Sequence, residues 1–430
     1  MSVKINIYFS IVFLSLIHFL SGSSETLPNT ISKIEIKGNQ VTKDYIILRE
    51  IHHPMNVPFD SVLATEDRDR IDNLGIFSDV KFYLQENGDD TSTLVYVVIE
   101  AWRIFPIPII QYEEETGWSF GGVGLIKNFR GKKQEIAIFS AGSESSSFKG
   151  IVFKDPWITG DHISLEIEAI GFFLEHPYRQ YDFTVRKLEL KIGKYFGYQK
   201  KLWITPHYKN RNVNELSNEP DLNHKHFIAD IEFHYDVRDL YINPSKGMIS
   251  KFRISSEYGL TSDSPNNLTL FNQTSYYRTV IPGRRIWIAG TSFSIQKWFG
   301  PDIIYQEKVM GSRKNVRGWT IPDHVSILDE EFRTGFNFFH ASVELRQTVI
   351  PKFITRFGTE FGMILVEFLD VGMADDNFID LWDKSPIFGA GFGVRIFMPG
   401  AQLLRLDYAW GFYEGKFRPP ELHFDIGHKF

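Results

Sequence analysis

The sequence ELHFDIGHKF, from Glu421 to Phe430, alternates between apolar and polar residues. Successive side chains of an extended strand point to opposite faces, so this stretch predicts one apolar and one charged face. The apolar face comprises Leu422, Phe424, Ile426 and Phe430, and the charged face comprises Glu421, His423, Asp425 and Lys429. The preceding segment LLRLDYAWGF (403–412) repeats the pattern, with Arg405 and Asp407 opposite leucines and aromatic residues. Such strands separate lipid from a polar lumen.

The composition of the whole chain agrees with this pattern. Its 430 residues can hold one small domain and one large closed sheet. Aromatic residues make up 15% of the chain and include 38 Phe, yet the mean hydropathy is slightly negative. A transmembrane β-barrel has this composition, because lipid-facing and lumen-facing residues cancel in an average. The composition argues against a helical membrane protein, and the net charge of −6 argues against a nucleic-acid partner.

About sixteen segments after residue 103 show the two-residue period of strands. They start near Ile107, Trp118, Gln134, Phe148, Ile163, Tyr181, Leu202, Phe227, Ile249, Thr269, Ile286, Phe336, Phe357, Ile387, Leu403 and Leu422. Membrane barrels favour an even number of strands. The sequence therefore predicts a mainly β protein in which residues 104–430 form a 16-stranded antiparallel transmembrane β-barrel.

A water-soluble β-sandwich is the alternative to a barrel, since its strands also alternate. One strand face of this chain, however, is polar or charged along its whole length. It carries Asp230, Glu232, His234, Asp236 and Arg238. Unpaired charges are costly in the core of a sandwich, whereas a wet lumen tolerates them. We therefore favour the barrel.

The first 23 residues have the composition of a secretory signal peptide. One cation, Lys4, precedes an apolar core from Ile5 to Leu20, and small residues follow up to Ser23. A retained N-terminal anchor is the less favoured alternative. The chain contains no cysteine, so we expect neither a lipoprotein anchor nor a disulfide scaffold. These features fit a protein exported into a bacterial envelope.

Residues 24–103 predict a small periplasmic domain of order β-α-α-β-β. The expected elements are a strand in 31–39, a helix over 43–50 capped by Thr42, a helix over 60–74, and strands over 76–84 and 93–100 joined by the turn QENGDD (85–90). Gly75 is expected to end the second helix in a left-handed turn.

This pattern resembles a POTRA domain, the periplasmic module of outer-membrane assembly proteins. The resemblance is carried by Gly38-Asn39, Leu74-Gly75, Phe77 and Val80. It implies that the strand containing Phe77, Val80, Lys81 and Tyr83 lies at the edge of the sheet, where an incoming chain can pair.

The stretch GSRKNVRGW (311–319) is unusually basic for its surroundings, with three cations between aromatic strands. Its motif VRGW, comprising Val316, Arg317, Gly318 and Trp319, resembles the inward-folded loop motif of the BamA/TamA superfamily. Five further stretches resemble that superfamily in the same order: FKDPW (153–157), DVRDLYINPSKG (236–247), SVELRQTVIPKF (342–353), FLDVGMA (368–374) and GAGFGVRIFMPGAQLLRLDYA (389–409). In the second of these, Asp236, Arg238, Pro244 and Gly247 mark a mid-barrel hairpin.

The resemblance implies that the loop over residues 298–334 folds into the barrel, where Arg317 pairs with acids on the inner wall. A guanidinium presents a planar fork that can bind two carboxylates. The strand pattern places Glu344 on the inner wall, and Asp370 is the second expected partner. Val366 and Phe368 share the side of Asp370, so we expect a bulge near Glu367 to restore a polar inner face.

The two ends of the predicted barrel carry residues that weaken a ladder. Pro106 and Pro108 in the first strand have no N–H to donate, and Gly427 in the last strand, which ends at Phe430, has no side chain to pack. The resemblance implies that these strands meet at a lateral seam. We expect few hydrogen bonds there, so that the seam opens sideways into lipid.

No enzyme signature is present, and we expect no cofactor and no metal. The adjacent His52 and His53 are expected to be a solvated pair, because no third ligand is near in sequence. The superfamily resemblance implies insertion of β-barrel proteins into a bacterial outer membrane, or passage of polypeptides across it. The expected partners are unfolded polypeptides and the lipid bilayer, with accessory lipoproteins as a further class. The alternatives are a two-partner-secretion exporter with a dedicated passenger, and a passive porin or surface barrel.

Overall fold

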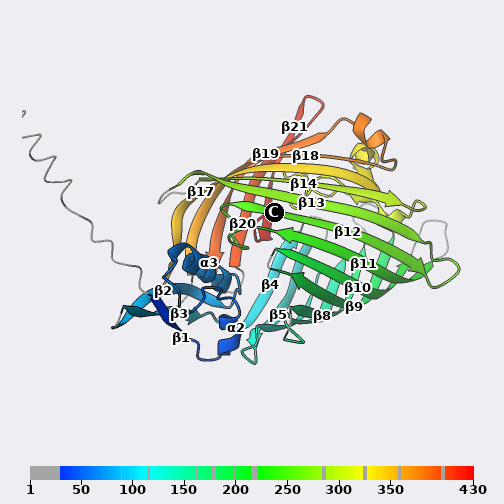
Figure 1. The fold of residues 1–430 in the computed structure, drawn as a ribbon. Coiled ribbons are helices and arrows are strands. Elements are labelled where there is room, and N and C mark those ends of the chain that lie inside the picture. Colours follow the sequence, from blue (N-terminus) through cyan, green and yellow to red (C-terminus); the bar gives the residue numbers. More distant parts are fainter. Residues whose placement is uncertain are drawn as a thin grey trace, which may run out of the picture.

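The computed structural model describes residues 30–88, 90–113, 117–160, 162–175, 181–197, 199–214, 221–282, 287–322, 327–356, 360–398 and 402–430. The predicted signal peptide, residues 1–23, lies outside these ranges. A three-stranded α/β domain precedes one 16-stranded sheet. Figure 1 shows this sheet curling round into a barrel, with the small domain at one end.

The N-terminal domain has the predicted order β-α-α-β-β. Its elements are β1 (Thr30–Lys37), α2 (Asp44–Leu48), α3 (Ser61–Asp72), β2 (Phe77–Gly88) and β3 (Thr91–Glu100). The central strand β3 pairs in parallel with β1 and antiparallel with β2, so that β2 is one of the two edges. The ladder between β2 and β3 continues to Gly88 and Thr91, so the six-residue turn predicted over residues 85–90 is wrong.

The helix ends of this domain differ in part from the prediction. Gly75 has a φ of 67°, the left-handed conformation that was expected of it. Thr42 does not cap the first helix, because its hydroxyl donates to Glu100 Oε1 at 2.6 Å. The second helix, α3, does have a side-chain cap: the carboxylate of Asp60 accepts hydrogen bonds from the backbone amides of Val62 and Leu63.

A buried carboxylate joins α3 to the segment before it. Asp67 is fully buried and accepts the backbone amides of His52 at 2.8 Å and His53 at 2.9 Å. It also accepts the hydroxyl of Tyr96 at 3.2 Å and forms an ion pair with Arg70. Burial, reinforced by the charge of Asp67, raises the pKa of Tyr96, which therefore remains a protonated donor.

The expectation of a solvated histidine pair is wrong for His53. Its side chain is buried, and its Nε2 accepts the backbone amide of Asp60 at 3.0 Å. The neighbouring carboxylate of Asp67 thus draws the His52-His53 backbone into the domain.

The large sheet contains a strand for each of the sixteen predicted segments. These are β4 (Ile104–Glu113), β5 (Gly117–Phe129), β6 (Gln134–Gly142), β7 (Ser146–Asp155), β8 (Ile163–Glu175), β9 (Asp182–Phe196), β10 (Lys200–Asn214), β11 (Leu222–Asp236), β12 (Gly247–Gly259), β13 (Asn267–Ile281), β14 (Trp287–Phe299), β17 (Asn337–Ile354), β18 (Glu360–Asp375), β19 (Ile387–Met398), β20 (Gln402–Tyr413) and β21 (Lys416–Ile426). Each strand pairs with the next one, and β14 pairs with β17 across a long loop. The predicted fold class is confirmed.

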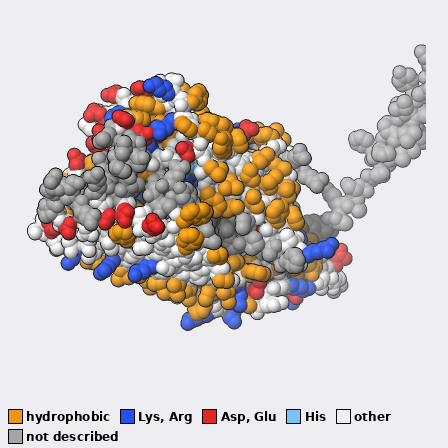
Figure 2. All heavy atoms as spheres, turned by 180° about the vertical axis from the view of Figure 1, so that it is seen from behind, with side chains coloured by type: hydrophobic (Ala, Val, Ile, Leu, Met, Phe, Trp, Pro, Cys, Tyr) orange, Lys and Arg blue, Asp and Glu red, His pale blue; other side chains and the backbone are white. Residues whose placement is uncertain are grey.

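The two faces of this sheet are the reverse of those of a soluble protein. Ile138, Leu188, Leu369 and Phe392 each expose more than half of their surface on the outside. Figure 2 shows hydrophobic side chains over much of the outer surface, with charged groups gathered towards its margins. The inner face instead buries charged residues of β17 to β20. An apolar exterior and a charged interior are what a barrel in lipid requires.

The described ranges contain no helix that is both long and apolar enough to cross a membrane.

The expected bulge near Glu367 is absent from the described part of β18. Its register against β19 runs without a shift from Gly362 to Gly372. Val366, Phe368 and Asp370 are therefore all buried on the inner side, while Glu367 is exposed on the outer side. The guanidinium of Arg317 in the long loop lies 3.4 Å from the ring of Phe368, and Val366 packs beside Phe368 in a cluster of buried wall residues, so that apolar side chains can be buried there.

Removal of the Asp67 carboxylate tests the packing of the N-terminal domain. We expect Asp67→Ala to destabilise this domain by about 2–4 kcal/mol, because two backbone amides and a tyrosine hydroxyl lose their acceptor. Urea-dependent pulse proteolysis of the full-length protein would measure this. Asp69→Ala on the same helix is the control, since Asp69 pairs with Arg68 at the surface and should cost less than about 0.5 kcal/mol. Equal effects of the two variants would contradict the assignment.

Candidate functional site

The loop between β14 and β17 enters the barrel as a two-stranded ribbon. Its short elements are η1 (Ile304–Gln306), β15 (Lys308–Val309), α4 (Ile327–Glu330), η2 (Glu331–Arg333) and β16 (Thr334–Gly335). The ribbon forms where β15 pairs antiparallel with β16. It carries the segment Gly311–Trp319 to the inner wall, where Arg317 is fully buried.

Arg317 meets three carboxylates, each from a different strand. Its Nε and Nη2 donate to the two oxygens of Asp370 at 2.8 and 3.0 Å. Its Nη1 donates to Glu344 Oε1 at 2.8 Å and to Asp407 Oδ2 at 3.0 Å. The ring of Phe368 lies 3.4 Å from the guanidinium carbon, an arrangement that favours a cation over the ring face. The guanidinium is thus satisfied by acids around its edge and by an aromatic ring on its face.

Further cations complete the charge balance around these acids. Arg346 Nε donates to Glu344 at 2.9 Å, and Arg395 Nη1 donates to Asp407 at 2.6 Å. Lys429 Nζ lies 2.8 Å from Asp370 Oδ1. We call this group the lumen cluster; its members are Arg317, Glu344, Asp370, Asp407, Arg346, Arg395 and Lys429. Its charges alternate in sign, which offsets the cost of burying them.

The residues beside Arg317 let the loop backbone contact the wall. Gly318 has a φ of 85°, and a Cβ there would lie 2.4 Å from the carbonyl carbon of Trp410. On the wall, a Cβ at Gly389 would lie 1.8 Å from the carbonyl oxygen of Arg317. Only glycine fits at either position. The contact is therefore backbone against backbone.

The two apolar residues of the motif are buried on the same wall. Val316 and Trp319 pack with Met310, Phe338, Ala374 and Ile387. The indole Nε1 of Trp319 donates to the carbonyl oxygen of Phe388 at 2.7 Å. The last position of the motif is thus filled by a large ring that also supplies a hydrogen-bond donor.

A second buried arginine, which the sequence analysis missed, holds the loop above the motif. Arg333 donates to the carbonyl oxygens of Met310 at 2.6 Å and Thr320 at 2.9 Å. It also pairs with Glu330, whose other oxygen accepts Arg418 of β21 at 2.6 Å. Nothing in the local sequence distinguishes Arg333 from a surface cation.

Asp407 was placed on the inner face by the strand pattern but was not recognised as a partner of Arg317. The signal was present, because Asp407 alternates with apolar residues in a clear period of two. The sequence pattern does not, however, give the height of Asp407 along the barrel axis relative to Glu344. That height depends on the stagger between the strands.

The predicted mid-barrel hairpin lies at the barrel end that faces the N-terminal domain. Arg238 forms a fork on Asp236, with its Nε and Nη2 at 2.9 and 2.7 Å from the two carboxylate oxygens. Gly247 has a φ of 100°, and a Cβ there would lie 2.2 Å from the carbonyl oxygen of Val237. Pro244 is buried between them. These four residues shape a rigid turn.

The predicted seam residues lie at the two ends of the sheet. Pro106 and Pro108 are on β4, and both are exposed. Within the described residues, no ladder joins β4 to β21. Gly427 has a φ of 86° and ends the pleat of the last strand.

Phe430 corrects the sequence analysis, because it lies inside the barrel and not on the outer face with Leu422 and Phe424. Its ring centroid lies 6.2 Å from that of Tyr277, and the guanidinium carbon of Arg346 lies 5.1 Å from the Phe430 ring. The left-handed turn at Gly427 redirects the last three residues inwards.

The predicted edge residues of the N-terminal domain lie on β2 with their side chains on two faces. Phe77 and Val80 are buried in the core against the helices, whereas Lys81 and Tyr83 are exposed. Among the residues that the structure describes, the backbone of β2 has a neighbour on the β3 side only.

The fold and the buried loop together define a class: β-barrel proteins with a small N-terminal domain and a loop fixed inside the lumen by an arginine. A sequence profile of the Omp85 superfamily domain matches residues 128–430, and a POTRA profile, described as a surface antigen variable number repeat, matches residues 29–101. The chain belongs to the Omp85 superfamily.

Individual relatives are distant. The chain is 22% identical over 144 residues to the outer membrane protein assembly factor BamA of Neisseria meningitidis, and 32% identical over 92 residues to BamA of Nitratidesulfovibrio vulgaris. These stretches cover 33% and 21% of this chain, but only 18% and 11% of the relatives.

Two solved structures share the fold. BamA of Haemophilus ducreyi lacking POTRA domains 1-3 has a TM-score of 0.55 at 15% identity, covering 92% of this chain and 83% of its own. CdiB of Acinetobacter baumannii has a TM-score of 0.56 at 12% identity, covering 93% of this chain and 74% of its own.

Truncation of Arg317 tests the lumen cluster. We expect Arg317→Ala to weaken the docking of the loop by about 3–5 kcal/mol, because three buried carboxylates lose their shared partner. The barrel should still insert in the membrane, while the loop becomes sensitive to protease. Arg313→Ala is the matched control, since Arg313 lies in the same loop, is partly exposed and faces Asp425 at 3.8 Å. A loop as well protected in Arg317→Ala as in Arg313→Ala would refute this account.

Proposed function

We propose that this protein inserts β-barrel polypeptides into the outer membrane, or moves polypeptides across it, through a lateral seam between β4 and β21. The observation that carries the proposal is that these two strands end the sheet without a ladder between them in the described residues. Unpaired backbone groups cost several kcal/mol each in lipid, so an open sheet edge there favours pairing with another strand.

The residues at the seam support an opening that requires little work. Pro106 and Pro108 cannot donate hydrogen bonds, and the pleat of the last strand stops at Gly427. An incoming strand can pair with the edge of β21 or β4 through its backbone, as in other cases of strand addition. In this mechanism backbone hydrogen bonds form and are released, but no covalent bond is made or broken. It therefore needs no cofactor.

The N-terminal domain supplies a second sheet edge for the same substrate. In the proposed orientation this domain lies in the periplasm, where unfolded polypeptides arrive. In the described part of the chain, strand β2 pairs on one side only, and it exposes Lys81 and Tyr83. We propose that it binds an extended segment of the polypeptide by strand addition before the segment reaches the seam.

The lumen cluster has a supporting role in this proposal. It fixes the long loop to β17, β18 and β20, so that one side of the barrel stays rigid while the seam moves. At Gly318 and Gly389 the loop backbone lies directly against the backbone of the wall. A rigid wall beside a weak seam confines the opening to one place.

Export of a dedicated passenger through the lumen is the second candidate function. It is favoured by the wall opposite the loop, where Lys187 of β9 pairs with Glu168 at 2.5 Å and Glu189 at 3.1 Å. Such a charged, paired surface can face a moving polypeptide without trapping it. Insertion remains the preferred proposal, because export through the lumen would require the buried loop to leave it.

Cysteines across the seam test the proposed route. We expect the pair Ile104→Cys and Phe424→Cys, or neighbouring outward positions, to block substrate insertion on oxidation and to restore it on reduction. Both native side chains are exposed, and the native chain has no cysteine that could interfere. Each single variant is the control. Full activity of quantitatively crosslinked protein would exclude the seam and would favour export through the lumen.

Depletion of the protein distinguishes the two candidate functions. Insertion predicts a loss of several outer-membrane β-barrel proteins, whereas dedicated export predicts that one secreted protein accumulates inside the cell. Quantitative proteomics of the outer-membrane and secreted fractions would measure both. An unchanged set of proteins in both fractions would contradict both proposals.

A further inference from the structure

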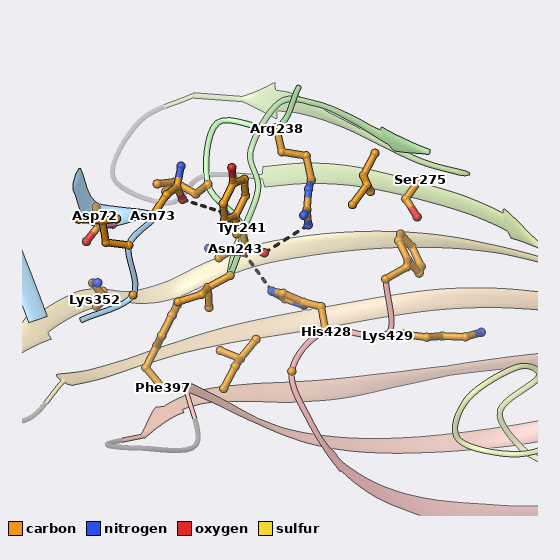
Figure 3. Close-up of a pocket in the computed structure, with 18 of the residues that line it drawn as sticks. Asp72, Asn73, Arg238, Tyr241, Asn243, Ser275, Lys352, Phe397, His428 and Lys429 are labelled. Carbon is orange, nitrogen blue, oxygen red and sulfur yellow. Dashed lines mark hydrogen bonds between the residues drawn. The ribbon is translucent and has the colours of Figure 1, made fainter. Parts of the chain in front are cut away.

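A cavity of about 660 Å³ lies at the barrel mouth that faces the POTRA domain. Three segments far apart in the sequence surround it: the end of α3, the turn between β11 and β12, and the last four residues, which we call the tail (427–430). Figure 3 shows Asn73, Tyr241, Asn243 and His428 arranged in a row beside this cavity.

Asn73 joins the POTRA domain to the β11–β12 turn with both ends of its amide. Its Nδ2 donates to the carbonyl oxygen of Asp239 at 3.0 Å, and its Oδ1 accepts the backbone amide of Tyr241 at 3.1 Å. Because one of these hydrogen bonds is donated by Asn73 and the other is accepted by it, together they fix both the distance and the orientation of the turn relative to α3. Asn73 is also the C-cap of α3, so it moves with the helix.

The turn itself is rigid enough to transmit a displacement. Asp239 accepts the backbone amide of Ser245 at 2.9 Å, closing the turn on itself. The guanidinium of Arg238 donates one hydrogen bond to the carboxylate of Asp236 and another, at 3.3 Å, to the carbonyl oxygen of Tyr241. A movement of Asp239 and Tyr241 must therefore carry Asn243 with it.

Asn243 joins the turn to the tail. Its Oδ1 lies 3.1 Å from His428 Nε2, which donates because the amide oxygen can only accept. Gly427 directs the tail into the barrel, as its φ of 86° shows. The hydrogen bond thus holds the tail across the mouth (Figure 3).

The tail ends in the lumen cluster. Lys429 reaches Asp370 at 2.8 Å and Ser342 Oγ at 2.6 Å, and it also contacts the carbonyl oxygen of Asn315 in the loop. Arg346 Nη2 donates to the backbone oxygen of Phe430 at 3.2 Å. The tail is therefore bound at one end by the POTRA-linked turn and at the other by the residues that hold Arg317.

We propose that Asn73 is a positioning residue whose contacts with the turn keep the tail inside the barrel, so that displacement of the POTRA domain releases the tail. Release opens the cavity to the lumen, frees the end of β21 and removes one cation from Asp370. This inference rests on the proposed function, because it makes engagement of a polypeptide by the POTRA domain the signal that loosens the seam strand.

Other contacts of the POTRA domain provide the fixed side for such a movement. The backbone amide of Lys43 donates to the carbonyl oxygen of Gly131 at 3.0 Å, and Asn128 Nδ2 donates to Thr42 Oγ1 at 2.8 Å. Arg49 stacks on Trp157 at 4.1 Å. These contacts lie at the β5–β6 and β7–β8 turns, so the domain can rotate about them and withdraw Asn73.

The test uses purified full-length protein in planar lipid bilayers, without any substrate. We expect Asn73→Leu to raise the open probability of the channel roughly 5- to 150-fold, the factor that the loss of two hydrogen bonds predicts. The matched control is Asn87→Leu, because Asn87 Nδ2 also makes two side-chain hydrogen bonds, but both stay within the POTRA domain. Asn73→Asp, which keeps the acceptor and loses the donor, should give an intermediate rise.

A double variant decides whether the contacts act as one chain. His428→Leu should raise the open probability like Asn73→Leu, and the double variant should add little to either, because both break the same connection. Heat-modifiable migration on gels would confirm that each barrel is folded. Open probabilities of Asn73→Leu and Asn87→Leu that are equal, or fully multiplicative effects of Asn73→Leu and His428→Leu, would overturn the proposal. Since no substrate is present, this outcome would leave the proposed insertion function to be judged separately.

Discussion

The buried guanidinium of Arg317 is the interaction on which the interior of this barrel depends. A cation without solvent is tolerated only where acids surround it, and here β17, β18 and β20 each supply one. The loop is therefore tied to three strands at once and cannot shift along any one of them. The same requirement explains the glycines around it, since the guanidinium reaches all three acids only if the loop backbone lies directly on the wall.

Binding the loop divides the inner wall into two kinds of surface. Under the loop the wall is dry, since Phe368 lies against the guanidinium of Arg317 and Phe338, Ala374 and Ile387 pack with the loop. Across the lumen, Lys187 and its acidic partners are only partly buried. This division accounts for the error at Glu367: we assumed a lumen that was wet throughout, and therefore expected a bulge to remove apolar residues from it.

The strands could be predicted because their signal is local. A period of two, set by lipid on one side, is visible within ten residues, and it located all sixteen strands and placed Glu344 and Asp407 on the inner face. The partners of Arg317 are a different matter, since they depend on how far each strand is staggered against the next. Family resemblance supplied Glu344 and Asp370, but no short pattern records the height of Asp407 on β20 or of Lys429 in the tail that follows β21. The prediction that Phe430 lies on the outer face was wrong because of the backbone at Gly427. Its left-handed conformation breaks the alternation of faces that holds up to residue 426.

The parity of the sheet decides which parts of the chain can meet. Antiparallel strands run alternately up and down, so an even number returns the chain to the end from which it started. With sixteen strands, the last residue comes back to the mouth beside the domain that precedes the first strand. Asn73 and His428, 355 positions apart in the numbering, can therefore bind the two ends of one short turn. One strand more or fewer would leave them on opposite sides of the bilayer.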